Sequence, residues 1–407
     1  MFEAAAVAEI QARAEILEQG CGGDTELRAL VEGMIGADGE AHEILDHPFA
    51  LTAADGAPGQ ERFESGAAIG PYRIIRELGA GGMGAVYLAE RADGSTPNLY
   101  AIKVMSWWSH GLVRRFRQEQ SILSRLQHPN IARLIESGMA HSKNPYFVME
   151  YVEGRPIQAF CKEDGYSIED RIRLFRQLCG AVRYLYQNLL VHRDLKPGNV
   201  LVTTEGVVKL LDFGIAKPLP GYDGAESLTQ TMAGLMTPDY ASPEQIRGEP
   251  ASTLTDVYAL GVVLYELLTG VKPFENPAKQ LHDKLRSICE EEPEKPSIAA
   301  QRRSPGDRKK VGHRLRGELD NIILKAMQKE PARRYGSVEQ LDEDLRRYLE
   351  GLPVLTQNDS VFYRMRKFVA RHRVGVAALT SIFMLLVGGA VATAMESRIA
   401  RKERARA

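Results

Sequence analysis

The segment 191–201, with the sequence VHRDLKPGNVL, limits what this chain can fold into more than any other stretch. It places an ammonium group at Lys196, two residues after the carboxylate of Asp194, and an amide at Asn199, five residues after it. A second carboxylate, Asp212, comes eighteen residues after Asp194 in the sequence LDFG. Phosphoryl transfer requires a proton acceptor, a cation and oxygen ligands for a metal ion. Four such groups at these spacings therefore indicate one site for that chemistry.

A glycine-rich segment lies upstream, at 78–86, with the sequence LGAGGMGAV and the form GxGxxGxV. Alone it is a weak signal, because such turns also occur in dinucleotide-binding folds and in ordinary structural hairpins. Extended segments are expected on both sides, at 72–78 and 85–91, with no helix after the second. This predicts a hairpin whose backbone N–H groups approach phosphates, rather than a strand-to-helix dinucleotide turn.

Lys103 lies within the apolar run Tyr100–Val104, which is predicted to be a strand. An unpaired ammonium group would be costly there, so Lys103 requires partners. The segment 112–126 has helical periodicity, and Glu119 falls on the same stripe as its apolar side chains. We therefore expect Lys103 to pair with Glu119 and to contact nucleotide phosphates.

Taken together, these segments resemble the protein kinase family, and further landmarks come in the family's order. The sequence FVMEYVEG at 147–154 resembles the hinge between the two lobes, and SPE at 242–244 stands where the family has APE. The resemblance implies an α+β, two-lobed fold with a small β-rich N-lobe and a larger helical C-lobe. It also implies ATP and Mg²⁺ as cofactors and protein Ser/Thr hydroxyls as substrates.

The resemblance assigns roles to the motif residues. Asp194 would accept the proton of the substrate hydroxyl, Lys196 would steady the γ-phosphoryl group, and Asn199 and Asp212 would hold magnesium. Lys103, paired with Glu119, would hold the α- and β-phosphates. Met149 would be the gatekeeper, and the backbones of Glu150 and Val152 would bond the adenine edge. The residues implied to line the nucleotide site are Leu78, Gly79, Ala80, Gly81, Gly82, Met83, Gly84, Ala85, Val86, Ala101, Lys103, Met149, Glu150 and Val152.

Lys196 and Thr237 resemble the residues that serine/threonine kinases have at these positions. Tyrosine kinases usually have Ala or Arg near the position of Lys196. Two other classes stay open. A pseudokinase scaffold that binds nucleotide without catalysis is disfavoured by the intact Lys103, Asp194, Asn199 and Asp212. A small-molecule kinase is disfavoured by Lys196 and by the SPE segment.

Other motif residues are expected to support or regulate the catalytic loop. Asp256 opens an apolar helix and would anchor the loop through its backbone N–H groups, while Arg334 would be the buried partner of Glu244. The segment between Asp212 and Glu244 is rich in Gly, Pro and hydroxyl-bearing residues, which suits a loop. Family resemblance predicts phosphorylation of at least one of Thr229 and Thr231 in this loop, and the alternative is that these hydroxyls are solvated turn residues.

Composition narrows the remaining possibilities. Lys and Arg total 52 against 53 for Asp and Glu, so overall charge indicates no nucleic-acid partner. The four cysteines form no C-x-x-C pair, which favours reduced thiols over a zinc site. No amino-terminal signal peptide is expected, because the start lacks a basic region and acidic residues interrupt the apolar ones after it.

The segment 374–395 contains 22 residues, none of which is charged. About 20 apolar residues of helix span a bilayer core, so a single membrane helix is predicted here rather than a buried core helix. Five basic residues on each side leave the positive-inside rule undecided. The predicted parts are a helical amino-terminal segment (1–50), a linker (51–71), a protein kinase domain (72–350), a basic juxtamembrane segment (351–373), the membrane helix (374–395) and a charged tail (396–407).

The sequences at 237–245, 317–323 and 363–368 narrow the resemblance to bacterial membrane-anchored serine/threonine kinases. It implies attachment to the cell inner membrane, with the kinase domain on the cytoplasmic side where ATP is available. Gly388 with Ala392, and Gly389 with Thr393, form small-xxx-small pairs, so a homodimer is possible, although lipid-facing small residues are the favoured interpretation. Whether the chain continues beyond Ala407 stays open.

Overall fold

The chain divides into two units, residues 1–60 and 61–407, and the described residues belong to the second. The predicted helical segment 1–50 lies outside the described residues. The computed structural model describes residues 62–81, 84–94, 98–105, 126–140, 144–163, 165–211, 217–218, 238–275, 281–302, 308–356, 365, 367, 369 and 371–404.

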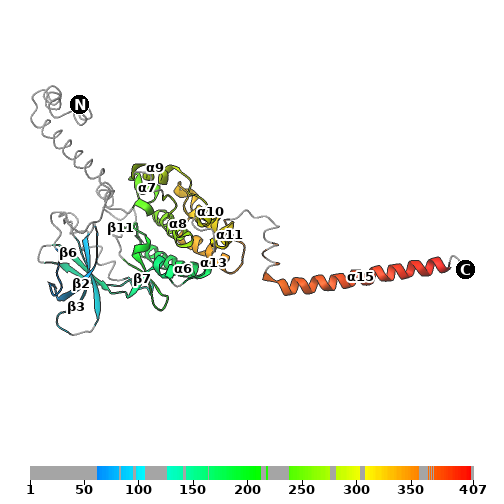
Figure 1. Cartoon of the computed structure of the whole chain (residues 1–407), viewed down its shortest axis with the longest axis horizontal. Coiled ribbons are helices and arrows are strands. Elements are labelled where there is room, and N and C mark those ends of the chain that lie inside the picture. The colour runs from blue at the N-terminus through cyan, green and yellow to red at the C-terminus, as the bar shows by residue number, and fades with distance from the viewer. Residues whose placement is uncertain are drawn as a thin grey trace, which may run out of the picture. The chain divides into compact units, whose positions relative to one another are not determined.

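The amino-terminal lobe is built on a six-stranded antiparallel sheet with the strand order β1-β2-β3-β4-β6-β5 (Figure 1). Alternating apolar side chains, among them Tyr72, Tyr87, Ile102 and Val148, are fully buried and form a core of this lobe alone. The expected β-rich small lobe is therefore confirmed. Its strands are β1 (Ala68–Ile69), β2 (Tyr72–Gly81), β3 (Gly84–Arg91), β4 (Leu99–Met105), β5 (Leu134–Met139) and β6 (Pro145–Glu150).

Residues 62–69, part of the segment expected to be a linker, pack on this lobe. The ring of Phe63 meets that of Tyr87 edge to face at 5.8 Å, and the N–H of Phe63 donates to the Tyr87 hydroxyl at 3.3 Å. Ile69, in β1, is also buried. Two isolated apolar side chains in a Gly- and Ala-rich stretch give no periodic signal, which is why the sequence did not indicate this packing.

The larger lobe is mainly helical, as expected, and carries a three-stranded sheet of order β10-β9-β7 and a two-stranded sheet of β11 and β8. These strands are β7 (Gly154–Pro156), β8 (Leu190–Val191), β9 (Val200–Thr203), β10 (Val208–Leu210) and β11 (Lys217–Pro218). The helices of this lobe are α5 (Ile157–Glu163), α6 (Ile168–Gln187), α7 (Pro243–Ile246), α8 (Thr253–Thr269), α9 (Leu281–Glu290), α10 (Pro296–Arg302), α11 (Arg308–Leu315), α12 (Glu318–Ala326) and α13 (Val338–Leu349), with 3₁₀ turns at Pro197–Asn199, Pro238–Tyr240 and Pro331–Arg333.

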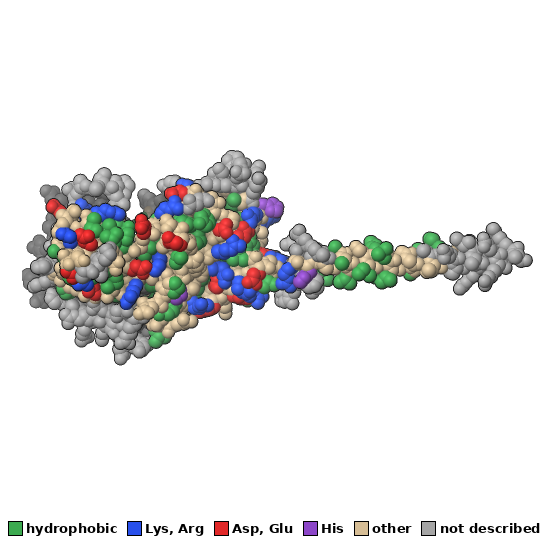
Figure 2. Space-filling view, turned by 90° about the horizontal axis from the view of Figure 1, so that it is seen from below, with side chains coloured by type: hydrophobic (Ala, Val, Ile, Leu, Met, Phe, Trp, Pro, Cys, Tyr) green, Lys and Arg blue, Asp and Glu red, His purple; other side chains and the backbone are tan. Residues whose placement is uncertain are grey.

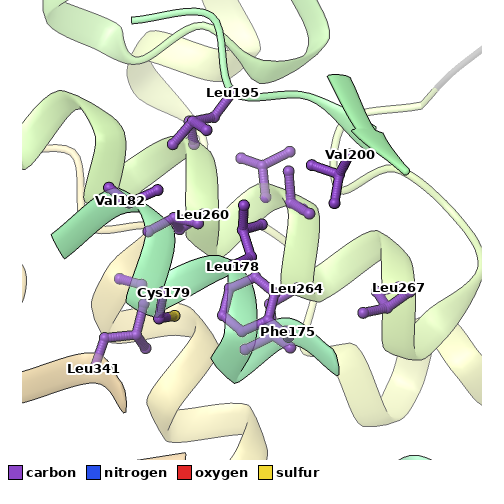
Figure 3. Close-up of a cluster of buried hydrophobic side chains, with 14 of the residues drawn as sticks. Phe175, Leu178, Cys179, Val182, Leu195, Val200, Leu260, Leu264, Leu267 and Leu341 are labelled. Carbon is purple, nitrogen blue, oxygen red and sulfur yellow. The ribbon is translucent and has the colours of Figure 1, made fainter. Parts of the chain in front are cut away.

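Helix α8 is the central element of the larger lobe. It is buried on all sides from Thr255 to Thr269, as expected for a helix that is apolar around its whole circumference. Figure 3 shows Leu264 of α8 in one cluster with Leu178 of α6. Leu195 and Val200 belong to the same cluster, so the core supports the catalytic loop directly.

Helix α15 (Arg373–Arg404) contains the segment predicted to span a membrane. Most of its described apolar side chains are exposed, up to 76% at Leu385, and Figure 2 shows them along the helix. Among the described residues, no helix is both long enough and apolar enough to cross a membrane. The membrane helix at 374–395 therefore stays a prediction.

Candidate active site

The catalytic loop brings three of the predicted residues together. The Lys196 ammonium lies 2.8 Å from Oδ2 of Asp194. The Asn199 side-chain amide donates from Nδ2 to the carbonyl oxygen of Asp194 at 2.8 Å and to its Oδ2 at 3.2 Å. The carboxylate of Asp194 is thus held by both a cation and an amide, beside the buried core of the larger lobe.

The second predicted metal ligand, Asp212, lies outside the described residues, but the chain leading to it is anchored at the same place. The N–H of Leu211 donates to the carbonyl oxygen of Asn199 at 2.7 Å, directly after β10. Leu211, the last described residue before Asp212, is therefore held next to Asn199.

The catalytic loop is held by a carboxylate from helix α8. Asp256, which is completely buried, accepts the N–H of Arg193 at 2.7 Å and the N–H of His192 at 2.8 Å. Arg193 has a φ of +66°, a left-handed conformation that is unfavourable for a residue with a side chain. Asp256 stabilises this conformation, so its predicted anchoring role is confirmed. Burial raises the pKa of Asp256.

A buried ion pair holds helix α7 in place. Arg334 Nη1 and Nη2 lie 2.7 Å from the two carboxylate oxygens of Glu244, which confirms the predicted pair. Burial alone would raise the pKa of Glu244, but the hydrogen bonds and charge of Arg334 outweigh burial and lower it. The next residue, Gln245, donates from Nε2 to the carbonyl oxygen of Arg193 at 2.9 Å. Helix α7 is thereby connected to the catalytic loop.

The glycine-rich segment forms the predicted hairpin. Leu78, Gly79, Ala80 and Gly81 end β2, and Gly84, Ala85 and Val86 begin β3. At Gly84, φ is +136°, and a Cβ atom would lie 2.0 Å from the carbonyl oxygen of Val104. No side chain fits there, so glycine is required for β3 to pair with β4. Gly82 and Met83 lie outside the described residues.

Lys103 and the hinge lie on strands beside this hairpin. Lys103 is 7% exposed and is paired with Val86 on β3, while Ala101 is paired with Met149 on β6. Glu119, the expected partner of Lys103, lies outside the described residues, so this pairing stays a prediction. The predicted phosphorylation sites Thr229 and Thr231 lie outside them as well, and so does Thr237, which indicated the serine/threonine class.

The hinge residue Glu150 binds both Arg133, just before β5, and Lys209 of the larger lobe. Its N–H donates to the carbonyl oxygen of Arg133 at 2.9 Å, and its carboxylate accepts the N–H of Arg133 and the ammonium of Lys209, the latter at 2.7 Å. The N–H of Glu150 is thus used within the protein. The adenine contacts that the resemblance implies would then use the carbonyl oxygen of Glu150 and the backbone of Val152.

Three supporting residues were not identified from the sequence: Gln245, Lys209 and Tyr186. The hydroxyl of Tyr186 lies 3.2 Å from Oδ2 of Asp256. Each contacts the site across more than fifty residues of chain. No local pattern marks such a contact, because it depends on how distant elements pack.

Comparisons with known proteins agree with this geometry. PrkC, a serine/threonine-protein kinase of Bacillus subtilis, is 36% identical over 281 residues, covering 68% of this chain and 40% of PrkC. PknB, a serine/threonine-protein kinase of Mycolicibacterium smegmatis, is 36% identical over 292 residues, covering 69% and 43%. The chain thus spans less than half the length of these relatives. The solved PknI kinase domain of Mycobacterium tuberculosis matches with a TM-score of 0.51 at 25% identity, covering 70% of this chain and 98% of that domain. The family model described as "Protein kinase domain" matches residues 72–345, more than half of the chain, and the chain therefore belongs to the protein kinase family.

Proposed function

We propose that this chain is an ATP-dependent protein-serine/threonine kinase. The observation that carries the proposal is the cluster of Asp194, Lys196 and Asn199, in which a carboxylate, a cation and an amide meet within hydrogen-bonding distance. A scaffold that binds nucleotide without catalysis would not need this arrangement. The names of the curated relatives support the serine/threonine class.

The residues suggest a division of labour during transfer. Asp194 orients the substrate hydroxyl and accepts its proton late in the reaction. Lys196 neutralises charge on the phosphoryl group as it moves, and Lys103 holds the α- and β-phosphates. Such positioning and charge stabilisation account for most of the catalysis in phosphoryl transfer.

The residues present fit a magnesium ion. Nδ2 of Asn199 donates to Asp194, so the amide oxygen is the end that can serve as a ligand. With the carboxylate of Asp212 it would give two hard oxygen ligands, the kind that Mg²⁺ prefers. The bound ion would neutralise phosphate charge, and Asn199 and Asp212 would hold it in place.

Replacing Asp194 with Asn tests the proposed reaction. Asp194→Asn should abolish transfer to a Ser/Thr peptide while ATP affinity stays close to native, because Lys103 and the hinge are unchanged. Lys103→Met should lower activity steeply through loss of the phosphate contact. Radiolabelled ATP, nucleotide binding and phosphosite mapping by mass spectrometry measure these effects. Undiminished autophosphorylation by either variant would refute the assigned roles, and label on a small molecule alone would refute the substrate class.

We further propose that residues 374–395 attach the kinase to the cell inner membrane, with the kinase domain in the cytoplasm. Three features support this: the long uncharged run in the sequence, the helical backbone of α15 and its exposed apolar side chains. The uncharged run extends over the whole segment, including residues whose side chains are not described.

Deleting residues 374–407 tests the membrane attachment. The full chain should sediment with membranes and resist carbonate extraction, whereas the shortened chain should stay in the supernatant and keep its activity. Protease added outside intact cells should spare the kinase domain, and its digestion would contradict the orientation. Crosslinking of the full chain in the same membranes tests whether two copies pair.

A further inference from the structure

The hydroxyl of Tyr186 lies beside the carboxylate that holds the catalytic loop. Tyr186 is the penultimate residue of α6, and its hydroxyl is 3.2 Å from Oδ2 of Asp256 and 3.0 Å from the carbonyl oxygen of Thr253. A phenol has one proton to donate, and an ionised carboxylate is a stronger acceptor than a carbonyl. The charged form of Asp256 therefore gains most from this hydroxyl.

The support that Asp256 gives depends on its ionisation. Its Oδ1 accepts the N–H of Arg193, and its Oδ2 accepts the N–H of His192 as well as the Tyr186 hydroxyl. A protonated Asp256 would carry an O–H at one of these oxygens, and that O–H would face another donor. One hydrogen bond to the loop would then be lost, and the left-handed backbone conformation of Arg193 would be less stable.

Burial disfavours the charged form of Asp256. Asp256 is completely buried, and burial raises its pKa above the ordinary value. The groups that face it are the imidazole and N–H of His192, the N–H of Arg193 and the hydroxyl of Tyr186, and all of them lower the pKa. Tyr186 is itself buried, and burial together with the charge of Asp256 raises the pKa of its phenol, which keeps the hydroxyl a donor.

We propose that Tyr186 is a positioning residue for phosphoryl transfer, whose hydroxyl keeps Asp256 ionised. Ionised Asp256 then holds His192 and Arg193 in the backbone conformation that sets the carboxylate of Asp194. The role of Tyr186 rests on the kinase activity proposed above. Tyr186 would thus affect kinase activity from helix α6, although it lies outside the sequence motifs.

The pH dependence of kcat in the full chain tests this role. Removing the hydroxyl in Tyr186→Phe should raise the pKa of Asp256, so the acid limb of the kcat profile should move to higher pH by about one unit. KM for ATP should change little, because Lys103 and the hinge are not involved.

Tyr335→Phe is a matched control. The Tyr335 hydroxyl also donates to a buried carboxylate, that of Asp344, at 2.9 Å, and neither residue belongs to the catalytic loop. Thermal unfolding should show a loss of stability in both variants, whereas the acid limb should move in Tyr186→Phe alone. A shift of equal size in Tyr335→Phe would overturn the proposal, because loosening of the lobe would then explain both.

Incorporating 3-fluorotyrosine at position 186 gives a second test that keeps the ring and the hydroxyl. The more acidic phenol is a stronger donor, so the acid limb should move to lower pH, and this result decides the question if Tyr186→Phe fails to fold. Acid limbs that coincide with native in an active, folded variant would overturn the proposal. An inactive native chain would instead refute the proposed kinase function.

Discussion

At the scale of single residues, Gly84 shows how one hydrogen atom in place of a side chain decides whether strands β3 and β4 can pair. Strand β3 passes so close to Val104 on β4 that a methyl group would overlap its carbonyl oxygen. Gly79, in the same hairpin, has open space around the position of a Cβ atom and a φ outside the left-handed region. The two glycines therefore differ in what they contribute to stability.

Gly84→Ala should lower the free energy of unfolding by about 2 kcal/mol or more, because the alanine would be forced into a left-handed conformation and a steric overlap. Gly79→Ala should change it little. Thermal unfolding without nucleotide measures both, so that any effect on ATP binding stays out of the comparison. Equal stability of the two variants would show that β3 can shift away from β4 at no cost.

The residues of the site divide into those that the sequence could indicate and those that it could not. Asp194, Lys196 and Asn199 lie within six consecutive residues, so their chemistry and their spacing predict that they meet. Glu244 and Arg334 are 90 residues apart and were paired through family resemblance. Nothing in the sequence distinguishes Tyr186 from the other residues of helix α6. Its contact with Asp256 arises only from the way α6 packs against α8.

At the scale of elements, the ion pair between Glu244 and Arg334 connects α7 to the segment before α13. Both side chains are almost completely buried, and Arg334 also donates to the carbonyl oxygens of Leu254, Gln328 and Lys329. Breaking such a pair leaves a buried charge without its partner, which costs far more than the intact pair contributes.

Glu244→Gln should destabilise the protein by about 3–5 kcal/mol at neutral pH. Because the folded-state pKa of Glu244 is lowered, its contribution is complete above the unfolded value of 4.5 and is lost as pH falls through the folded value. The difference in Tm between native and variant should therefore narrow below about pH 4.5.

Glu343→Gln is the matched control for this experiment. Arg346 and Arg347 lower the pKa of Glu343 to about 2. The Glu343 side chain is 33% exposed at the surface, where solvent screens the pair, so little stability depends on it. Tm should hardly change at any pH. A large effect at Glu343, or a pH-independent effect at Glu244, would contradict the argument from burial.

At the scale of the whole kinase domain, the two lobes have separate cores and meet through both apolar and polar contacts. Leu134 of β5 belongs to the core of the larger lobe, and Phe147 and Met149 of β6 pack against it. The hinge residue Glu150 joins Arg133, next to β5, to Lys209 on β10. The segment before β5 also pairs with β10, through the N–H of Ala132 and the carbonyl of Leu210 at 2.9 Å. The sequence predicted two lobes correctly, but these contacts depend on their mutual placement, which no local periodicity encodes.

The left-handed conformation of Arg193 makes the geometry of the catalytic loop depend on correct folding of the larger lobe. The loop does not hold this shape by itself: α8 supplies Asp256, α7 supplies Gln245, and α6 supplies Tyr186. A copy in which any of these helices is misplaced would lose the loop geometry along with its support. Under the proposed kinase function, such copies would be inactive rather than unregulated, because phosphate transfer would require a correctly assembled lobe.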